Sequence, residues 1–188
     1  MTPKPNLPFE YDPSLEEYMV NEKDFLASNP QHNTLVIGAV VFNGEGKQLL
    51  VQRAADEQAF PNAWEIPGGK VDDTDETIIH AAVRELKEET GLEAKRIVRK
   101  VGEFGWNDVH RRTGKPRIWH KVIFEIEPKD LNIVLDPVEH QHYLWATEEE
   151  VTNDKVGDVA LAYIPNPENK AIKLDAFKLK REAVAATA

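Results

Sequence analysis

The most informative segment of this chain is Arg84-Glu85-Leu86-Lys87-Glu88-Glu89-Thr90-Gly91-Leu92. Glu85, Glu88 and Glu89 are spaced i, i+3 and i+4, which places their carboxylates on one face of a helix. Gly91 stands where a helix should end, because glycine readily adopts the left-handed conformation of a C-terminal cap. Like charges at this spacing repel one another, so the pattern predicts a positive partner. Mg²⁺ and Mn²⁺ are hard cations that prefer such carboxylate oxygens.

The alternative interpretation of these glutamates is a solvated helix face, which is the commoner role of such pairs. Two features of the neighbouring sequence favour a site instead. A strand-like segment, residues 64–67, and the pair Gly68-Gly69 come before the helix, and Thr74 or Asp75 is predicted to cap it. The helix also has a separate apolar face, made of Ile79, Ala82, Val83 and Leu86. We therefore expect one side to be buried while the neighbouring side faces a cleft.

This segment resembles the signature box of the Nudix hydrolases, G-x5-E-x7-R-E-U-x-E-E-x-G-U, where U is aliphatic. The second half of the box matches at every specified position, and so does the spacing from Glu76 to Arg84. The first spacing departs from the family, because six residues rather than five separate Gly69 from Glu76. We interpret the extra residue as an insertion in loop 70–75. The alternative, Asp75 at the glutamate position, would break the spacing to Arg84.

The resemblance covers roughly residues 33–152 and implies the fold and the chemistry of that family. The implied fold is an α/β (α+β) sandwich, with a mixed β-sheet between helices. Glutamates of the box hold one or more Mg²⁺ or Mn²⁺ in the family, which implies metal-binding roles for Glu85, Glu88, Glu89 and the carbonyl of Gly69. Arg84 is implied to orient these glutamates by ion pairing, with Glu76 as its expected partner.

A general base for activating water is expected downstream of the box. Residues 137–145 resemble the family segment that supplies a further glutamate before a strand with tryptophan, which points to Glu139 as base or additional metal ligand. The alternative is a loop glutamate in solvent. His140 and His142 are neighbours of a residue type suited to proton transfer, but two surface histidines are the commoner explanation.

Substrate contacts are predicted from the basic residues. Arg53 ends its predicted strand where many members of the family present a phosphate-binding arginine, and a surface charge is the alternative. The basic cluster of this acidic chain consists of His110, Arg111, Arg112, Lys115 and Arg117. Arg112 and Arg117 are candidates to contact a polyphosphate, although charged hairpins are usually solvated. Trp106 and Trp119 either stack a base or anchor the hairpin in the core, and we favour the core. Phe60 and Trp64 are interpreted as packing residues.

Composition limits the functional classes. The net charge of −10 argues against binding to a nucleic-acid duplex, which requires a basic surface. It also favours metal dependence, because an acidic cleft repels a phosphate substrate unless cations are present. The chain has no cysteine, which excludes disulfides and thiolate chemistry. No secretory signal is visible at the N-terminus, and the longest apolar run, near residues 35–42, is too short to cross a bilayer. The expected location is cytoplasmic, without membrane association.

Three zones are predicted along the chain. Residues 1–30 form a proline-rich arm with one helix, which has a capping-box pattern at Ser14-Leu15-Glu16-Glu17. This arm packs on its own domain or against a partner subunit of a homodimer, since members of the resembled family often dimerise. Residues 31–152 form the Nudix-type domain, with strands predicted at 34–42, 48–53, 97–104, 118–126 and 143–146. The turn at residues 43–46 predicts that residues 48–53 return along residues 34–42 as a hairpin. Residues 153–188 form a helical extension, capped by Asn166 with Pro167 in its first turn.

The combined expectation is a metal-dependent hydrolase that cleaves the diphosphate bond of a small molecule by attack of water on phosphorus. A nucleoside diphosphate linked to a further moiety X is the favoured substrate class. A non-nucleotide substrate such as a prenyl diphosphate is an alternative, because the box binds only the diphosphate and metal. A binding or regulatory module of the same fold without catalysis is a further alternative, against which the complete set of glutamates argues.

Overall fold

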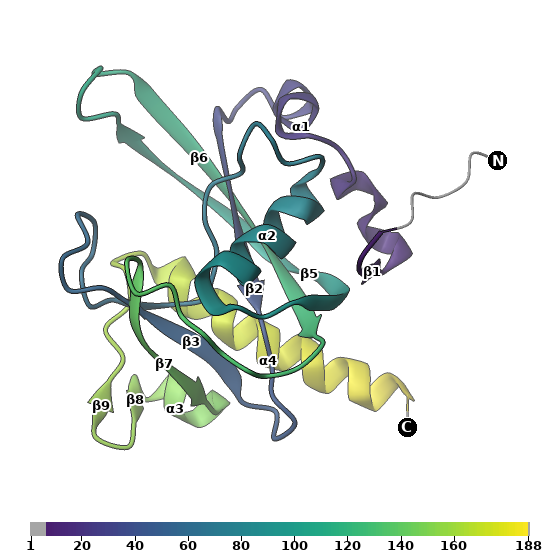
Figure 1. The fold of residues 1–188 in the computed structure, drawn as a ribbon, viewed down its shortest axis with the longest axis vertical. Coiled ribbons are helices and arrows are strands. Elements are labelled where there is room, and N and C mark those ends of the chain that lie inside the picture. Colours follow the sequence, from purple (N-terminus) through teal and green to yellow (C-terminus); the bar gives the residue numbers. More distant parts are fainter. Residues whose placement is uncertain (1–6, 188) are drawn as a thin grey trace.

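A four-stranded mixed sheet lies at the centre of the computed structural model, which describes residues 7–187 (Figure 1). Its order is β1 (Glu10–Tyr11), β5 (Ala94–Val109), β6 (Pro116–Pro128) and β2 (Thr34–Val40). Strands β5 and β6 form a long antiparallel hairpin, whereas β2 pairs with β6, and β1 with β5, in parallel. Residues 1–6 of the predicted arm lie outside the described part.

A smaller antiparallel sheet packs beside it, in the order β4 (Trp64–Glu65), β3 (Gln48–Arg53) and β7 (His140–Ala146). The sequence predicted that residues 48–53 return along residues 34–42 as a hairpin. The antiparallel return is present at the turn, where a bridge joins Phe42 to Gln48 and the N–H of Leu49 donates to the carbonyl of Val41. Beyond it the prediction was wrong, because β3 pairs with β4 and β7 in the second sheet. After β7 come α3 (Glu148–Thr152) and a ribbon of β8 (Lys155–Val156) and β9 (Val159–Ala160).

Helices cover both faces of the central sheet: α2 (Ile78–Thr90) on one side and α4 (Pro167–Thr187) on the other. On β6, Val122 and Phe124 belong to the core that contains α2, whereas Ile123 between them packs with α4. Successive strand residues point to opposite faces, so the two helices lie on opposite sides. Strand β2 is buried along its whole length, as its continuous apolar sequence predicts. The predicted sandwich with a mixed sheet between helices is confirmed.

Helix α2 begins later than the sequence predicted. Its N-cap is Thr77, whose hydroxyl accepts a hydrogen bond from the backbone N–H of His80. Thr74 and Asp75 instead belong to the preceding loop, so both predicted caps were wrong. At the other end the prediction holds, because Gly91 caps the helix in the left-handed conformation with a φ of 72°. The predicted cap of α4 also holds, since Asn166 Oδ1 accepts from the N–H of Glu168.

The N-terminal arm contains two short helices rather than one. A 3₁₀-helix, η1 (Pro13–Tyr18), is capped by Asp12 rather than through the predicted capping box, and α1 (Glu22–Ser28) is capped by Asn21. Phe9, Leu15 and Tyr18 are buried in the same core as α2. Within residues 7–187, the structure has no helix with both the length and the apolar character needed to cross a membrane.

Candidate active site

The Gly68-Gly69 turn brings the backbone close to the carboxylates of α2. The N–H of Ile37 donates to the carbonyl of Gly69 at 2.9 Å, which holds the turn against β2. Gly68 has a φ of 145°, and a Cβ there would lie 2.3 Å from the carbonyl oxygen of Ile37. At Gly69 a Cβ would lie 2.6 Å from Oε2 of Glu85. Gly68 is therefore required by the backbone, whereas a side chain at position 69 would displace the carboxylate of Glu85.

The three glutamates of α2 have different surroundings. Glu89 is 4% exposed and its Oε2 accepts the N–H of Gly68 at 2.7 Å. Burial, together with the charges of Glu65, Glu85 and Glu139, raises the pKa of Glu89 well above its usual value. Burial also raises the pKa of Glu85, against the effect of neighbouring Arg84. Glu88 is largely exposed. The negative charges of these carboxylates repel one another, and a bound cation would reduce that repulsion.

Arg84 holds two of these glutamates in place. Its Nη1 donates to Oε1 of Glu85 at 2.8 Å and to Oε2 of Glu88 at 2.7 Å. Its Nε and Nη2 form a bidentate pair with Asp75, not with Glu76 as predicted. The Glu76 side chain is 82% exposed and lies 3.8 Å from His80 Nε2. The supporting role assigned to Glu76 was therefore wrong, because the turn before Thr77 directs Asp75 inward and Glu76 into solvent.

Glu139 and His140 join the cluster from the start of β7. Potential metal-ligand atoms of Glu89, Glu139 and His140 all lie within 4.8 Å of one another. Glu139 is exposed, whereas His140 is 1% exposed, so the interpretation of His140 as a surface residue was wrong. The Nε2 of His140 lies 3.4 Å from Oε1 of Glu65, and its buried Nδ1 has no hydrogen-bond partner within the described chain. His142 is exposed, as expected.

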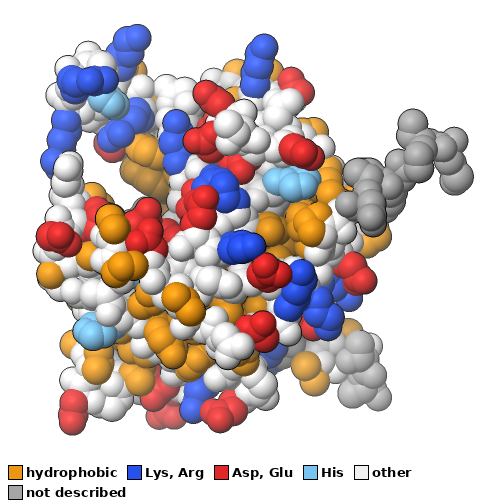
Figure 2. Space-filling model, in the orientation of Figure 1, with side chains coloured by type: hydrophobic (Ala, Val, Ile, Leu, Met, Phe, Trp, Pro, Cys, Tyr) orange, Lys and Arg blue, Asp and Glu red, His pale blue; other side chains and the backbone are white. Residues whose placement is uncertain are grey.

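The predicted substrate-binding arginines have different surroundings. Arg53 donates to Glu65, to Glu57 and to the carbonyl of Ala59, and thereby fastens the β3–β4 loop. Arg117 forms two hydrogen bonds with Asp108, at 2.7 and 2.6 Å, and its guanidinium lies over the Trp119 ring. Arg112 is exposed in the turn between β5 and β6. Figure 2 shows basic side chains at the tip of this hairpin and acidic side chains over the adjoining body. Contact of any of the three with substrate stays a prediction.

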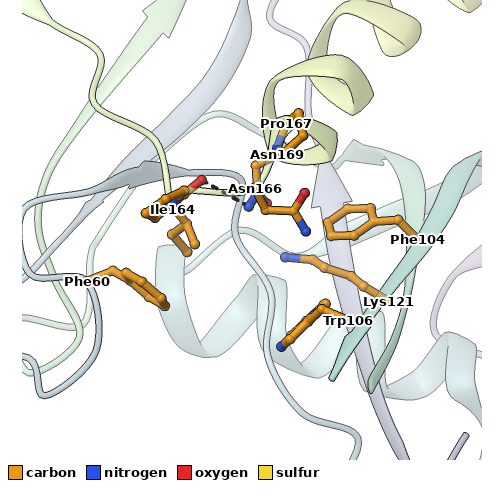
Figure 3. Close-up of a pocket in the computed structure, with 9 residues that line it drawn as sticks. Phe60, Phe104, Trp106, Lys121, Ile164, Asn166, Pro167 and Asn169 are labelled. Atoms are coloured by element: carbon orange, nitrogen blue, oxygen red, sulfur yellow. Dashed lines mark hydrogen bonds between the residues drawn. The ribbon is translucent and has the colours of Figure 1, made fainter. Parts of the chain in front are cut away.

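A cavity of about 320 Å³ opens between the β3–β4 loop, the central sheet and the start of α4 (Figure 3). Its lining is mainly apolar and consists of Phe60, Phe104, Trp106, Lys121, Ile164, Pro165, Asn166, Pro167 and Asn169. Trp106 stacks on Trp119 with ring centroids 5.3 Å apart, yet it also lines the cavity, as does the half-exposed Phe60. The interpretation of Phe60 as a packing residue was therefore wrong. Lys121 relates the cavity to the glutamate cluster, because the charges of Glu65 and Glu89 raise its pKa against the effect of burial.

Sequence comparisons match this site to known proteins. A family model of the NUDIX domain matches residues 32–165. The CTP pyrophosphohydrolase of Escherichia coli (strain K12) is 39% identical over 112 residues, which cover 60% of this chain and 75% of that protein. An RNA pyrophosphohydrolase of Novosphingobium aromaticivorans is 27% identical over 132 residues, which cover 61% of this chain and 78% of that protein.

Solved structures share the fold. A MutT protein from Methanosarcina mazei Go1 has a TM-score of 0.60 at 19% identity, covering 93% of this chain and 98% of that one. The NUDIX domain of Shewanella oneidensis NrtR, complexed with ADP ribose, has a TM-score of 0.60 at 20% identity, covering 85% and 99%. Because the family model matches well over half of the chain, this protein belongs to the NUDIX family and is a Nudix hydrolase.

Proposed function

We propose that this Nudix hydrolase is a divalent-metal-dependent pyrophosphohydrolase whose substrate is a nucleoside diphosphate linked to a further group X. The observation that carries the proposal is that Glu85 and Glu89 meet the Gly68-Gly69 turn, with Glu139 close to Glu89. An aromatic-lined cavity lies within reach of their charge, because Lys121 of its wall interacts electrostatically with Glu89. Such a site can hold the diphosphate at the carboxylates and X or the nucleoside in the cavity. The relatives named for action on CTP and on RNA support a nucleotide substrate.

The donor set fits a hard divalent cation such as Mg²⁺ or Mn²⁺. Glu85, Glu88, Glu89 and the Gly69 carbonyl are the proposed ligands, since they supply oxygen atoms that such ions prefer. His140 is a further candidate ligand that the sequence did not suggest, because its ligand atom lies close to those of Glu89 and Glu139. When bound, the cation neutralises negative charge on the diphosphate oxygens and favours attack on phosphorus.

The residues of the chain supply the remaining chemistry. Glu139 is exposed beside Glu89, and we assign it as the base that accepts a proton from the attacking water. The water oxygen forms a bond to phosphorus, and the anhydride P–O bond breaks with its electron pair leaving on the departing phosphate. Arg84 fixes Glu85 and Glu88 in one arrangement, which reduces the reorganisation needed during the reaction.

The test is release of phosphate and of monophosphates from a panel of diphosphates in Mg²⁺ or Mn²⁺. The panel contains nucleoside triphosphates, dinucleoside polyphosphates, ADP-ribose, nucleotide sugars and prenyl diphosphates. We expect turnover of a nucleotide class, reduced about 10²-fold or more in Glu88→Gln. The matched control is Glu149→Gln, an exposed glutamate of α3, which should retain full activity.

Each other outcome of the panel has a definite meaning. Turnover of prenyl diphosphates alone would replace the nucleotide assignment with the non-nucleotide alternative. Turnover that is equal in wild type and Glu88→Gln would remove Glu88 from the catalytic site. A folded protein that binds Mn²⁺ and hydrolyses nothing in the panel would contradict the proposal and favour a binding module.

A further inference from the structure

Lys121 occupies an unusual position in the middle of the central sheet. It is a residue of β6, with Val36 of β2 and Phe104 of β5 as its register partners. Its side chain is on the same face as the cavity and is 8% exposed in total. Gly38 makes room for it, because a Cβ there would lie 3.0 Å from Cε of Lys121. The neighbouring strands therefore hold the long side chain in place.

The ammonium group of Lys121 has no hydrogen-bond or ion-pair partner in the part of the chain that the structure describes. Among residues 7–187, no atom accepts a hydrogen bond from its Nζ, and no carboxylate oxygen lies within 4.0 Å of it. Figure 3 shows the Nζ pointing into the cavity. Burial lowers the pKa of Lys121, while the charges of Glu65 and Glu89 act in the opposite direction. The ammonium group therefore faces the cavity with its donors available, and this arrangement points to a ligand that supplies an acceptor inside the cavity.

The walls of the cavity indicate the shape of that ligand. Phe60 contributes an aromatic ring from the β3–β4 loop, with Ile164 beside it, and Trp106 contributes another from β5 on the opposite side (Figure 3). A cavity of about 320 Å³ is near the lower end of the range for small-molecule sites, roughly 300–1,000 Å³. Apolar and aromatic walls of this size suit one flat ring system. The matching ligand is a planar ring with an acceptor at the edge that meets Lys121.

We propose that Lys121 determines base specificity by donating a hydrogen bond to a carbonyl oxygen of the substrate's nucleobase. This inference rests on the proposed function and names its substrate class: nucleotides of guanine, cytosine, uracil or thymine. Adenine has no carbonyl oxygen. Next to its N7 or N1 acceptor, adenine has an amino group, and this hydrogen-bond donor would face the ammonium group, which is also a donor. Adenine nucleotides are therefore the disfavoured substrates.

The experiment compares GTP, CTP, UTP and ATP as substrates of wild type and Lys121→Met, which keeps the stem but removes the donors. For wild type, kcat/KM should be roughly 10- to 100-fold higher for the best carbonyl-bearing nucleotides than for ATP. In Lys121→Met this preference should disappear, through a higher KM for the carbonyl-bearing substrates. Lys100→Met is the matched control, because Lys100 is in the same sheet and pairs with Tyr18 and Glu103 away from the cavity.

Calorimetric binding of GMP, CMP, UMP and AMP without metal separates this inference from the proposed function. If the wild type hydrolyses no nucleotide, the proposed function is overturned. The role of Lys121 would still be supported if a carbonyl-bearing monophosphate binds more tightly than AMP and Lys121→Met abolishes that difference. Equal use and binding of all four bases by wild type would overturn the role of Lys121, even if the variant does not fold. An equal loss with ATP and GTP in a folded variant would also overturn it, since Lys121 would then act on the phosphates or the metal.

Discussion

Arg84 and Asp75 are joined by two parallel hydrogen bonds, Nε to Oδ1 at 2.8 Å and Nη2 to Oδ2 at 2.9 Å. The Asp75 side chain is 5% exposed, so this pair is largely shielded from solvent. The same guanidinium uses its Nη1 to hold Glu85 and Glu88. Asp75 therefore positions two proposed metal ligands through Arg84. Five residues separate Gly69 from Asp75, which is the spacing of the box from its glycine to its glutamate. With Asp75 in that role, the extra residue lies between Asp75 and Arg84, so its interpretation as an insertion in loop 70–75 was wrong.

The first prediction concerns this pair. Asp75→Asn removes the charge that fixes Arg84, and we expect a loss of roughly 10- to 100-fold in kcat/KM and about 1–3 kcal/mol in the free energy of unfolding. Glu76→Gln is the matched control, because its side chain is exposed and should change either quantity little. Steady-state kinetics and urea unfolding of both variants check this. The reverse ranking, with Glu76→Gln more damaging, would restore the pairing expected from the motif alone.

The second prediction concerns the space above Gly69. In Gly69→Ala the new methyl group would meet both carboxylate oxygens of Glu85, at 2.6 and 2.8 Å, and displace a flexible side chain rather than the backbone. We expect activity to fall about 10²-fold, because small displacements at a catalytic site are costly, while the melting temperature changes little. Gly44→Ala is the control, since nothing lies within 4 Å of the added atom. Full activity of Gly69→Ala would show that the position of Glu85 does not limit the reaction.

The third prediction separates function from stability at Glu89. This buried carboxylate is surrounded by like charges, and its raised pKa shows that the charged form is disfavoured in the fold. Glu89→Gln keeps an acceptor for the N–H of Gly68 and removes the charge. We expect the metal-free protein to gain about 1–2 kcal/mol, or roughly 2–8 °C in melting temperature. Thermal unfolding with and without Mn²⁺ tests this, because Mn²⁺ should stabilise wild type and leave the variant unchanged.

Helix α2, its Gly91 cap and the buried strand β2 could be predicted because their signals are local. The partner of Arg84 could not be predicted in this way, because the motif specifies only the spacing of residues along the sequence. The conformation of the turn at residues 72–77 determines which side chain points inward. In that turn Asp75 Oδ2 also accepts the N–H of Asp72, which draws Asp75 toward the helix. Counting alone gives no such information.

The parts of the site that depend on strand pairing could not be predicted from the sequence either. Strand β3 lies between β4 and β7, and its Arg53 is the register partner of His140. This pairing buries His140 next to Glu65, which comes from β4. Lys121 and the cavity depend on the packing of the β3–β4 loop, the central sheet and the start of α4. A single sequence does not show which of these distant segments meet.

Lys173 is a buried residue of α4, four positions after Asn169, and the fourth prediction tests its charge. Its Nζ donates to the carbonyl of Asn169 at 2.6 Å and lies 4.6 Å from the Tyr163 ring centroid. Burial, with a contribution from the charge of Lys121, lowers the pKa of Lys173 from 10.5 to about 7. Between these two values the unfolded chain binds a proton that the folded protein does not. Stability contributed by this group must therefore rise with pH from about 7 toward 10.5.

Urea unfolding of wild type and Lys173→Met at pH 6, 7, 8 and 9 measures this dependence. Relative to the variant, wild type should gain up to about 1.4 kcal/mol per pH unit above pH 7 and nothing below pH 6. Lys178→Met is the control, because Lys178 is on the same helix and its side chain is 64% exposed. The free energy of unfolding of Lys178→Met should differ from that of wild type by the same amount at every pH. If the Lys173→Met curve also runs parallel, Lys173 keeps its proton in the folded state and its burial costs less than the structure indicates.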